Sequence, residues 1–289
     1  MKKYVVAIAV VWLHASTIAK EDEVVDYAYL DLNLSKQTVE ARLRVPDKPN
    51  GHALVILHHA GGWGANTTDQ YAKFFNERGY ITLEPRMFNF RGGIKNTLEH
   101  TGQAMGALQF LAQRPDVDPA KIDVMGLSYG SYLTTYATTE WVTQRFSQGK
   151  YRFRKAAALY PVCWSMDAIA RGTVPGWLKK NSNFPPFPDG FFNSLNGTVL
   201  RFFVAGEDEY DDKDTGTCQH LIDAITDPRV KSLMSVKIYP GVTHAWDQNR
   251  NETWYERIGC KGRGCDIKAR HDQQQTDLAM KELVNFFEN

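Results

Sequence analysis

Residues 122–130 read Ile-Asp-Val-Met-Gly-Leu-Ser-Tyr-Gly, and this stretch decides the fold. The apolar run before Gly126 predicts a short buried strand, and residues 128–146 have a helical pattern. Glycines placed two positions before and after Ser128 allow a strand and a helix to approach each other closely around a tight turn. The stretch therefore predicts a strand, a sharp turn that carries Ser128, and a helix that follows at once.

Strands and helices alternate on both sides of this turn. The expected strands are 52–58, 80–83, 121–125, 155–160, 199–205 and 235–239, and the expected helices are 66–78, 97–113, 128–146, 218–225 and 274–287. Such alternation buries a sheet on both faces, which requires mostly parallel strands with right-handed crossovers. Residues 24–33 and 38–45 predict an antiparallel hairpin. The sequence thus predicts an α/β protein with a mostly parallel central sheet, helices on both faces and an N-terminal hairpin.

Length and composition favour one domain over residues 20–289, since 289 residues with 43% hydrophobic side chains suffice for one large core. Residues 1–19 are interpreted as a signal peptide, because two lysines precede an apolar stretch of about ten residues, too short to span a bilayer. A short membrane anchor or a buried first helix is the alternative. We expect export to a periplasm or to the medium.

Residues 171–198, rich in proline and aromatic side chains, predict an irregular insert that is either a lid or a structural loop.

The four cysteines are an even set, which in an exported chain favours two disulfides. Cys260 and Cys265 bracket a Lys-Gly-Arg-Gly turn, which favours their pairing and leaves Cys163 for Cys218. The sequence alone does not fix these pairs. Because no Cys-x-x-Cys or His-x-x-x-His pattern accompanies the cysteines, no metal site is expected.

Two residues stand out as candidates for nucleophilic chemistry. Ser128 would lie at a helix N-terminus, where the helix dipole and free backbone amides favour a developing oxyanion. His244 lies in the segment Tyr-Pro-Gly-Val-Thr-His-Ala-Trp, residues 239–246, directly after the last expected strand. A histidine on a loop at the carboxyl edge of a parallel sheet is free to reach a serine there. A structural turn and a structural histidine are the alternatives.

A third member should be an acid that orients the imidazole, and residues 206–212, Gly-Glu-Asp-Glu-Tyr-Asp-Asp, supply several candidates after an expected strand. We favour Asp208, with Glu209 second and Asp211 third. The chain order of serine, acid and histidine is that of the α/β-hydrolases, and differs from the chymotrypsin and subtilisin orders.

A glycine-rich segment, residues 58–64, reads His-His-Ala-Gly-Gly-Trp-Gly and follows another expected strand. Acyl transfer needs two backbone N–H donors at the oxyanion, and we assign them to Ala60 and Tyr129. His59, Trp63 and Trp246 are predicted to bind substrate as parts of the pocket wall. For His59 this role is favoured over that of a metal ligand, and structural packing would explain either tryptophan equally well.

With these segments in place, the chain resembles the dienelactone hydrolase family of α/β-hydrolases over most of its mature length. The segments that carry the resemblance are 57–62, 79–86, 126–130, 206–209 and 239–246. The family's best-known members use a cysteine nucleophile and a glutamate after the third strand, whereas Ser128 and His59 stand at what look like those positions. Dienelactone itself is therefore a poor guess for the substrate.

These observations predict a carboxylic ester hydrolase that cleaves small or medium-sized esters through an acyl-enzyme. A peptidase or acyltransferase with the same residues, and a non-catalytic binding protein, are the alternatives. Because 34 basic and 33 acidic residues leave a net charge of +1, neither nucleic acid nor a membrane surface is an expected partner. No dinucleotide or P-loop pattern is present, so no cofactor is expected.

Overall fold

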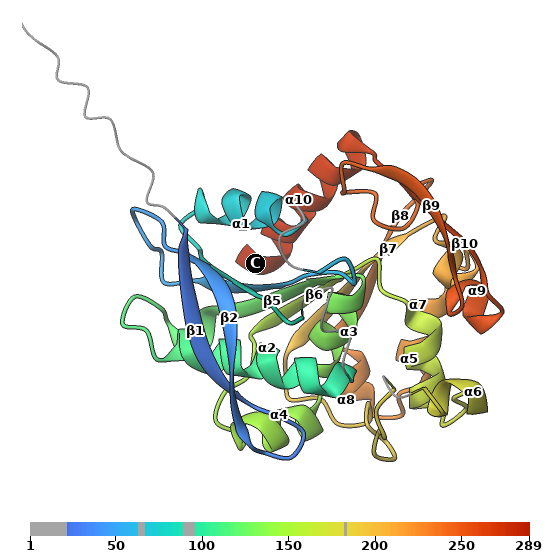
Figure 1. Cartoon of the computed structure of the whole chain (residues 1–289), viewed down its shortest axis with the longest axis horizontal. Coiled ribbons are helices and arrows are strands. Elements are labelled where there is room, and N and C mark those ends of the chain that lie inside the picture. Colours follow the sequence, from blue (N-terminus) through green and yellow to red (C-terminus); the bar gives the residue numbers. More distant parts are fainter. Residues whose placement is uncertain (1–21, 63–66, 89–95, 182–183) are drawn as a thin grey trace, which may run out of the picture.

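An eight-stranded sheet forms the centre of the computed structural model, which describes residues 22–62, 67–88, 96–181 and 184–289 (Figure 1). The strand order is β1-β2-β4-β3-β5-β6-β7-β8. The strand bounds are β1 Glu23–Leu30, β2 Lys36–Arg44, β3 Ala53–Leu57, β4 Ile81–Pro85, β5 Ile122–Leu127, β6 Lys155–Leu159, β7 Val199–Ala205 and β8 Met234–Tyr239. Strands β3 to β8 are parallel, whereas β1 pairs antiparallel with β2 and β2 with β4. The predicted parallel sheet and N-terminal hairpin are thereby confirmed.

Helices cover both faces of this sheet. The bounds are α1 Asp69–Asn76, α2 Thr97–Ala112, α3 Tyr129–Tyr136, α4 Glu140–Ser147, α5 Cys163–Ala170, α6 Gly176–Lys179, α7 Thr217–Ala224, α8 Pro228–Lys231, α9 Gly259–Gly262 and α10 Gln273–Glu288, with short 3-10 turns at Pro119–Lys121 and Glu209–Asp211. Helices α1 and α10 pack on one face, and α2, α3, α4 and α7 pack on the other (Figure 1). Strand β3 shows why, because Val55 and Leu57 join the core on one face while Leu54 and Ile56 join that on the other.

The helix expected over 128–146 is two helices, α3 and α4, and this corrects the prediction. The hydroxyls of Thr138 and Thr139 donate to the carbonyls of Thr135 and Tyr136, which ends α3. The Thr139 hydroxyl also accepts from the amide of Val142 and so caps α4. Threonine competes with the helical backbone for hydrogen bonds and favours caps, which places the break at these residues.

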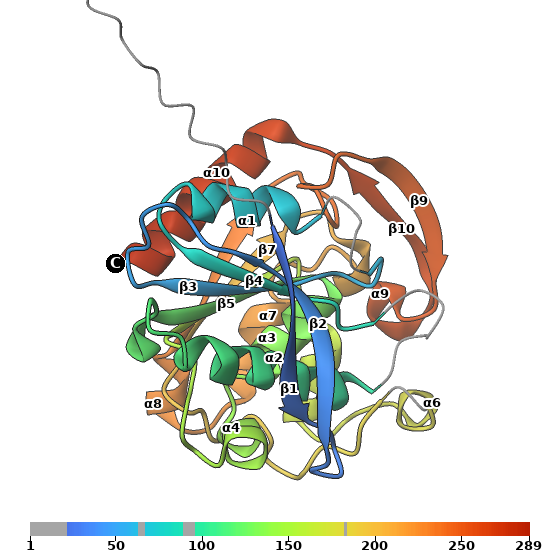
Figure 2. The ribbon, with the colours of Figure 1, turned by 60° about the vertical axis from the view of Figure 1, so that its left-hand side comes forward.

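A second, two-stranded sheet was not predicted from the sequence. Strands β9 Asn251–Glu256 and β10 Cys265–Arg270 pair antiparallel, with α9 between them (Figure 2). This hairpin contacts both loops that carry the predicted acid and histidine. The amide of Lys268 donates to the Glu209 carboxylate, and the amide of Arg270 donates to the Thr243 hydroxyl. The hairpin therefore forms a wall beside the carboxyl edge of the main sheet.

The insert 171–198 divides into two parts with different surroundings. Its first part contains α6 and places Leu178 and Phe184 in the wall of a cavity at Ser128. Its second part packs Phe187 and Phe191 on the ring of Tyr136 in the core. The insert thus contributes both to a cavity wall and to the core.

Two disulfides join Cys163 to Cys218 and Cys260 to Cys265, the pairing that the sequence favoured. The first ties α5 to α7, and the second closes the turn of the β9–β10 hairpin. Two disulfides fit a protein that matures in an oxidising compartment. The predicted signal peptide, residues 1–19, lies outside the described residues. In the described part of the chain, none of the helices combines the length and apolar composition needed to cross a bilayer.

Removing the Cys163–Cys218 disulfide by double substitution to alanine is expected to lower the free energy of unfolding by about 4 kcal/mol, because its closed loop of 55 residues restricts the unfolded chain. The double alanine variant at Cys260 and Cys265 is the matched control. Its separation of 5 residues predicts a loss of only about 2 kcal/mol. Urea unfolding monitored by tryptophan fluorescence measures both, and equal losses would contradict the chain-entropy explanation.

Candidate active site

Ser128 occupies a strained turn between β5 and α3. Its φ of 48° lies in the left-handed region, which residues other than glycine rarely adopt. A Cβ on Gly126 would lie 2.1 Å from the carbonyl oxygen of Gly130, and a Cβ on Gly130 would lie 2.3 Å from that of Leu57. Only glycine fits at either position, as the sequence pattern predicted. The turn holds the Ser128 hydroxyl at the carboxyl edge of the sheet.

Three side chains that are distant in the sequence form one hydrogen-bonded row. Nε2 of His244 lies 2.8 Å from Oγ of Ser128, and Nδ1 of His244 lies 2.7 Å from Oδ2 of Asp208. His244 and Asp208 are buried, with exposed fractions of 2% and 3%. An imidazole held between a hydroxyl and a carboxylate has the tautomer and orientation needed to accept the hydroxyl proton.

The other acid candidates have different partners. The Glu209 carboxylate turns toward β10 and accepts from the amide of Lys268 at 3.1 Å. The Asp211 carboxylate accepts from the amides of Cys163 and Trp164 at 2.9 and 2.8 Å, at the start of α5. Burial and the neighbouring Asp208 raise the pKa of Asp211 to about 8. Of the three candidates, only Asp208 is hydrogen-bonded to the imidazole, and its Oδ1 is fixed by the amide of Tyr210 at 3.0 Å.

Aromatic rings hold the His244 imidazole in place. Its ring lies 4.5 Å from Tyr210, 5.0 Å from Tyr160 and 6.5 Å from Trp254, measured between centroids. Two of the neighbouring backbone positions are strained, because Tyr160 has a φ of 38° and Ala245 a φ of 54°. Strained backbone that gathers around one group of polar side chains is typical of a functional site. None of these aromatic contacts was predicted.

Two neutral histidines lie beneath the same edge. Nδ1 of His58 lies 2.8 Å from the carbonyl of His59, and Nε2 accepts from the amide of Met87 at 3.2 Å, which together require the neutral ring. Burial lowers the pKa of His58 to about 4. Burial, and to a lesser extent Arg250, His58 and His244, lower the pKa of His59 to about 3. Nδ1 of His59 accepts from the amide of Gly61 at 2.7 Å, so this ring stiffens the glycine-rich turn.

The lowered pKa of His58 predicts an acid-sensitive contribution to stability. In the unfolded chain a histidine has a pKa near 6.5, whereas the pKa of His58 in the folded protein is about 4. Between these two pH values the unfolded state binds a proton at this residue and the folded state does not, so protonation favours unfolding. The contribution is complete above pH 6.5 and is lost as the pH falls toward 4. Between pH 7.5 and 4.5, His58→Gln should therefore gain about 2 to 3 kcal/mol relative to the parent. Chemical denaturation at both pH values measures this, and a constant difference would refute it.

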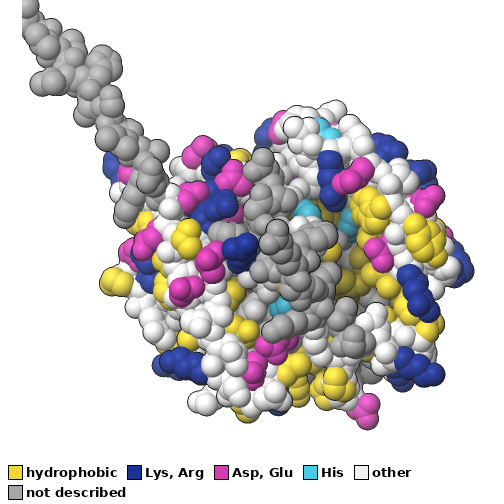
Figure 3. All heavy atoms as spheres, viewed as in Figure 1, with side chains coloured by type: hydrophobic (Ala, Val, Ile, Leu, Met, Phe, Trp, Pro, Cys, Tyr) yellow, Lys and Arg dark blue, Asp and Glu magenta, His cyan; other side chains and the backbone are white. Residues whose placement is uncertain are grey.

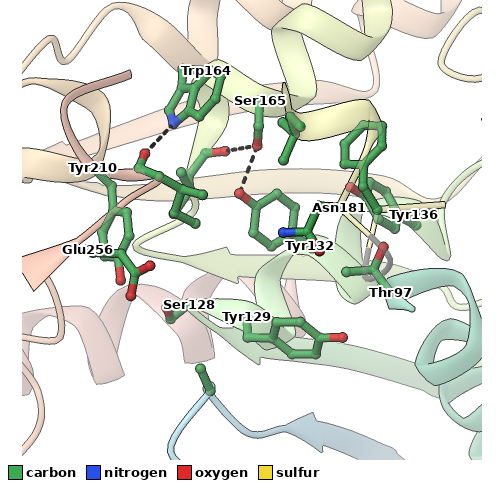
Figure 4. A pocket seen from close by; sticks show the side chains of 15 residues that line it. Thr97, Ser128, Tyr129, Tyr132, Tyr136, Trp164, Ser165, Asn181, Tyr210 and Glu256 are labelled. Carbon is green, nitrogen blue, oxygen red and sulfur yellow. Dashed lines mark hydrogen bonds between the residues drawn. The ribbon is translucent and has the colours of Figure 1, made fainter. Parts of the chain in front are cut away.

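Two cavities meet at Ser128. The larger, about 270 Å³, has a mainly apolar wall, rich in aromatic rings, to which α3, α5, the insert and the hairpin contribute (Figure 4). The smaller, about 200 Å³, has a more polar wall that contains His59, His244 and Arg250. Both are lined by Ala60, Ser128, Tyr210 and Glu256. Figure 3 shows hydrophobic side chains and histidine atoms meeting in a hollow on this face of the molecule.

The remaining predicted site residues have different places. Ala60 and Tyr129, the predicted oxyanion donors, line the larger cavity beside Ser128. His59 lines the smaller cavity. Trp63 lies outside the described residues.

The prediction that Trp246 binds substrate is corrected by the structure. Its ring is fully buried in the core and is absent from the described walls of both cavities. It stacks on Tyr239 with 5.2 Å between centroids. Burial of an indole removes a large apolar area from water, which stabilises the folded protein.

In the smaller cavity, the sequence interpretation missed Tyr210, Arg250, Trp254 and Glu256 as wall residues. Three of them lie in or just before β9, where the half-buried Trp254 and Glu256 alternate with the exposed Thr253 and Tyr255. A grouping of Cys163, Cys218 and Asp211 also has the spacing of a metal site. Both sulfurs are joined in a disulfide, so they supply no thiolate ligands.

The topology and the chain order together place the molecule in the α/β-hydrolase class, whose members carry the serine, the acid and the histidine in this order along the chain. Within this class, residues 39–289 match the family model described as the dienelactone hydrolase family, and the chain belongs to that family. The resemblance seen in the sequence is thereby confirmed. Family membership supports a hydrolase, and esterases are among the similar structures.

Solved structures share the fold at low sequence identity. A putative dienelactone hydrolase from Klebsiella pneumoniae is 12% identical with a TM-score of 0.61, over 92% of this chain and 99% of its own. Esterase 2 from Thermogutta terrifontis, phosphoramylated by tabun, is 14% identical with a TM-score of 0.60, over 95% and 96%. A dienelactone hydrolase-like promiscuous phosphotriesterase from metagenomic libraries is 12% identical with a TM-score of 0.58, over 92% and 98%. None of the curated proteins matches this sequence.

Proposed function

We propose that the protein is a serine esterase that cleaves carboxylic esters through an acyl-enzyme. The observation that carries the proposal is the hydrogen-bonded row of Ser128, His244 and Asp208 at the wall of two cavities. His244 takes the proton of Ser128 while Oγ attacks the ester carbonyl. It then returns that proton to the departing alcohol, and water releases the acyl group by the same route. Asp208 stabilises the imidazolium that forms in each half of the cycle.

The backbone amides of Ala60 and Tyr129 are the proposed donors to the tetrahedral oxyanion. Both residues line the larger cavity with Ser128, and Tyr129 is the first residue of α3. An amide at a helix N-terminus is preoriented toward developing negative charge. Loss of one such donor typically costs about 100- to 1000-fold in turnover.

The two cavities support a division between the acyl and alcohol parts of the ester. His244 belongs to the wall of the smaller cavity and is absent from the described wall of the larger one. Because the histidine must protonate the leaving oxygen, the alcohol is expected in the smaller cavity beside it. The acyl group then occupies the larger cavity, whose wall contains six aromatic residues: Tyr129, Tyr132, Tyr136, Trp164, Phe184 and Tyr210.

A panel of para-nitrophenyl esters of increasing acyl length tests this function. The limited volume of about 270 Å³ predicts that kcat/KM rises from acetate to medium-length acyl groups and falls for long-chain fatty acyl groups. Release of nitrophenolate measures each rate. Peptide anilides of matched size serve as the comparison, and a preference for them would favour a peptidase over an esterase.

We also propose that the protein acts outside the cytoplasm after loss of residues 1–19. The basic and apolar pattern at the start of the sequence and the two disulfides support this location. Expression of the whole chain in a bacterial host, followed by fractionation and N-terminal sequencing, should give a mature protein that begins at Lys20. Recovery of the uncleaved chain with reduced cysteines would count against export.

A further inference from the structure

One side chain in the wall of the larger cavity has no role in the proposed cycle. Glu256, at the end of β9, lines both cavities and is the only charged residue in the described wall of the larger one. Figure 4 shows its carboxylate beside Tyr210, on the side of the cavity near Ser128. The cross-strand neighbour of Glu256 is Cys265, whose disulfide to Cys260 holds this part of the hairpin in place.

Among the described residues, the carboxylate of Glu256 lacks a cation partner. Across the described parts of the chain, no lysine or arginine nitrogen lies within 4 Å of it. The basic residues closest to it in the sequence have other partners. The Arg257 guanidinium lies over the Trp177 ring, Lys261 pairs with Asp214 at 2.7 Å, and Arg250 pairs with Glu252 at 2.6 Å. The charge of Glu256 acts on the cavity wall. Burial is the main cause that raises the pKa of the Tyr210 hydroxyl, and the negative charge of Glu256 raises that pKa further.

A negative charge at the edge of an aromatic chamber favours one class of ligand. Aromatic faces attract cations through their quadrupoles, and a carboxylate adds a direct charge attraction within the same partly desolvated space. An anionic acyl group would instead be repelled. The smaller cavity has no such one-sided charge, because Arg250 lies in its wall together with Glu256. Binding of a cationic group is therefore favoured in the larger cavity, which is on the acyl side of the ester.

We propose that Glu256 and the aromatic wall of the larger cavity select esters whose acyl group carries a protonated or quaternary amine. This inference rests on the proposed esterase function and on the division of the two cavities, and it adds the chemical class of the acyl group. Glu256 acts as a specificity residue and takes no part in proton transfer.

Two para-nitrophenyl esters with the same shape test the proposal in the parent protein. One is the ester of trimethylammoniobutanoic acid, and the other is the ester of the dimethylhexanoic acid in which carbon replaces the nitrogen. After division by the rate of hydroxide-catalysed hydrolysis, kcat/KM should be about tenfold higher for the cationic ester. Equal values, or a preference for the neutral ester, would overturn the proposal.

Substitution then assigns the preference to Glu256. Glu256→Gln should reduce the ratio of the two kcat/KM values by about tenfold, and it should improve hydrolysis of an ester with a terminal carboxylate. Glu77→Gln, an exposed site at the end of α1, makes the same change in net charge and should keep the parent ratio. A ratio that is unchanged in Glu256→Gln would overturn the assignment.

The failure of the esterase function can be told apart from the failure of this inference. If neither ester is hydrolysed, the esterase function fails. The inference is then tested separately by calorimetric binding of the matching amides to Ser128→Ala. Tighter binding of the cationic amide, lost in the additional Glu256→Gln variant, supports the recognition site. Equal binding of the two amides overturns it.

Discussion

Replacing Ser128 with alanine is expected to lower kcat on a short para-nitrophenyl ester by on the order of 10⁶-fold, because the proposed cycle loses its nucleophile. The residual rate should still exceed the rate in water, since the oxyanion donors and the cavities remain. The fold should survive, because Ser128 makes its backbone contacts through its amide and carbonyl, which bond to Leu159 and Ser131. Steady-state kinetics, with circular dichroism as the check on folding, measures this.

Ser165→Ala is the matched control for that experiment. Its hydroxyl also lies in the wall of the larger cavity and is bonded to the Tyr132 hydroxyl at 2.7 Å. Loss of a neutral hydrogen bond predicts less than about a tenfold change in kcat/KM. If Ser128→Ala were as active as Ser165→Ala, Ser128 would not be the nucleophile.

Asp208→Asn is expected to lower kcat by about 10⁴-fold, because an amide stabilises the wrong imidazole tautomer and no longer balances the imidazolium. Glu209→Gln should have little effect on kcat, since its carbonyl oxygen can still accept from the Lys268 amide. The comparison uses the same short ester, with kcat measured from pH 5 to 9. A large loss in Glu209→Gln together with a small one in Asp208→Asn would reverse the assignment of the acid.

The strand-turn-helix at Ser128 could be predicted because its cause is local. A short apolar run and two glycines at fixed positions leave few alternatives, and the contacts that a Cβ on Gly126 or Gly130 would make explain both glycines. The parallel sheet followed from the alternation of strands and helices for a similar reason. In these cases the spacing of residue types carries the structural information.

The choice of acid could not be settled from the sequence. Asp208, Glu209 and Asp211 lie within four residues of one another, and each ends up buried with a different partner. Their directions depend on the 3-10 turn Glu209–Asp211, on the amides at the start of α5 that bond to Asp211, and on β10, which packs against the turn. The acidic segment by itself does not specify which distant residues will contact each carboxylate.

The hairpin β9–β10 was missed because half of it faces solvent and its residues are mostly polar or charged. Cross-strand pairing and the Cys260–Cys265 disulfide define it more than an apolar pattern does. As a consequence, Trp254 and Glu256 did not enter the predicted site. Trp246 was assigned to the pocket for the opposite reason, since proximity to His244 in sequence does not show which way a large ring points.

Reaction with a fluorophosphonate probe, followed by mass spectrometry of the digested protein, tests the nucleophile most directly. The proposed mechanism predicts one adduct, located on Ser128, which forms much more slowly in Asp208→Asn. A correctly folded protein that remains unlabelled, or an adduct at a different residue, would contradict it.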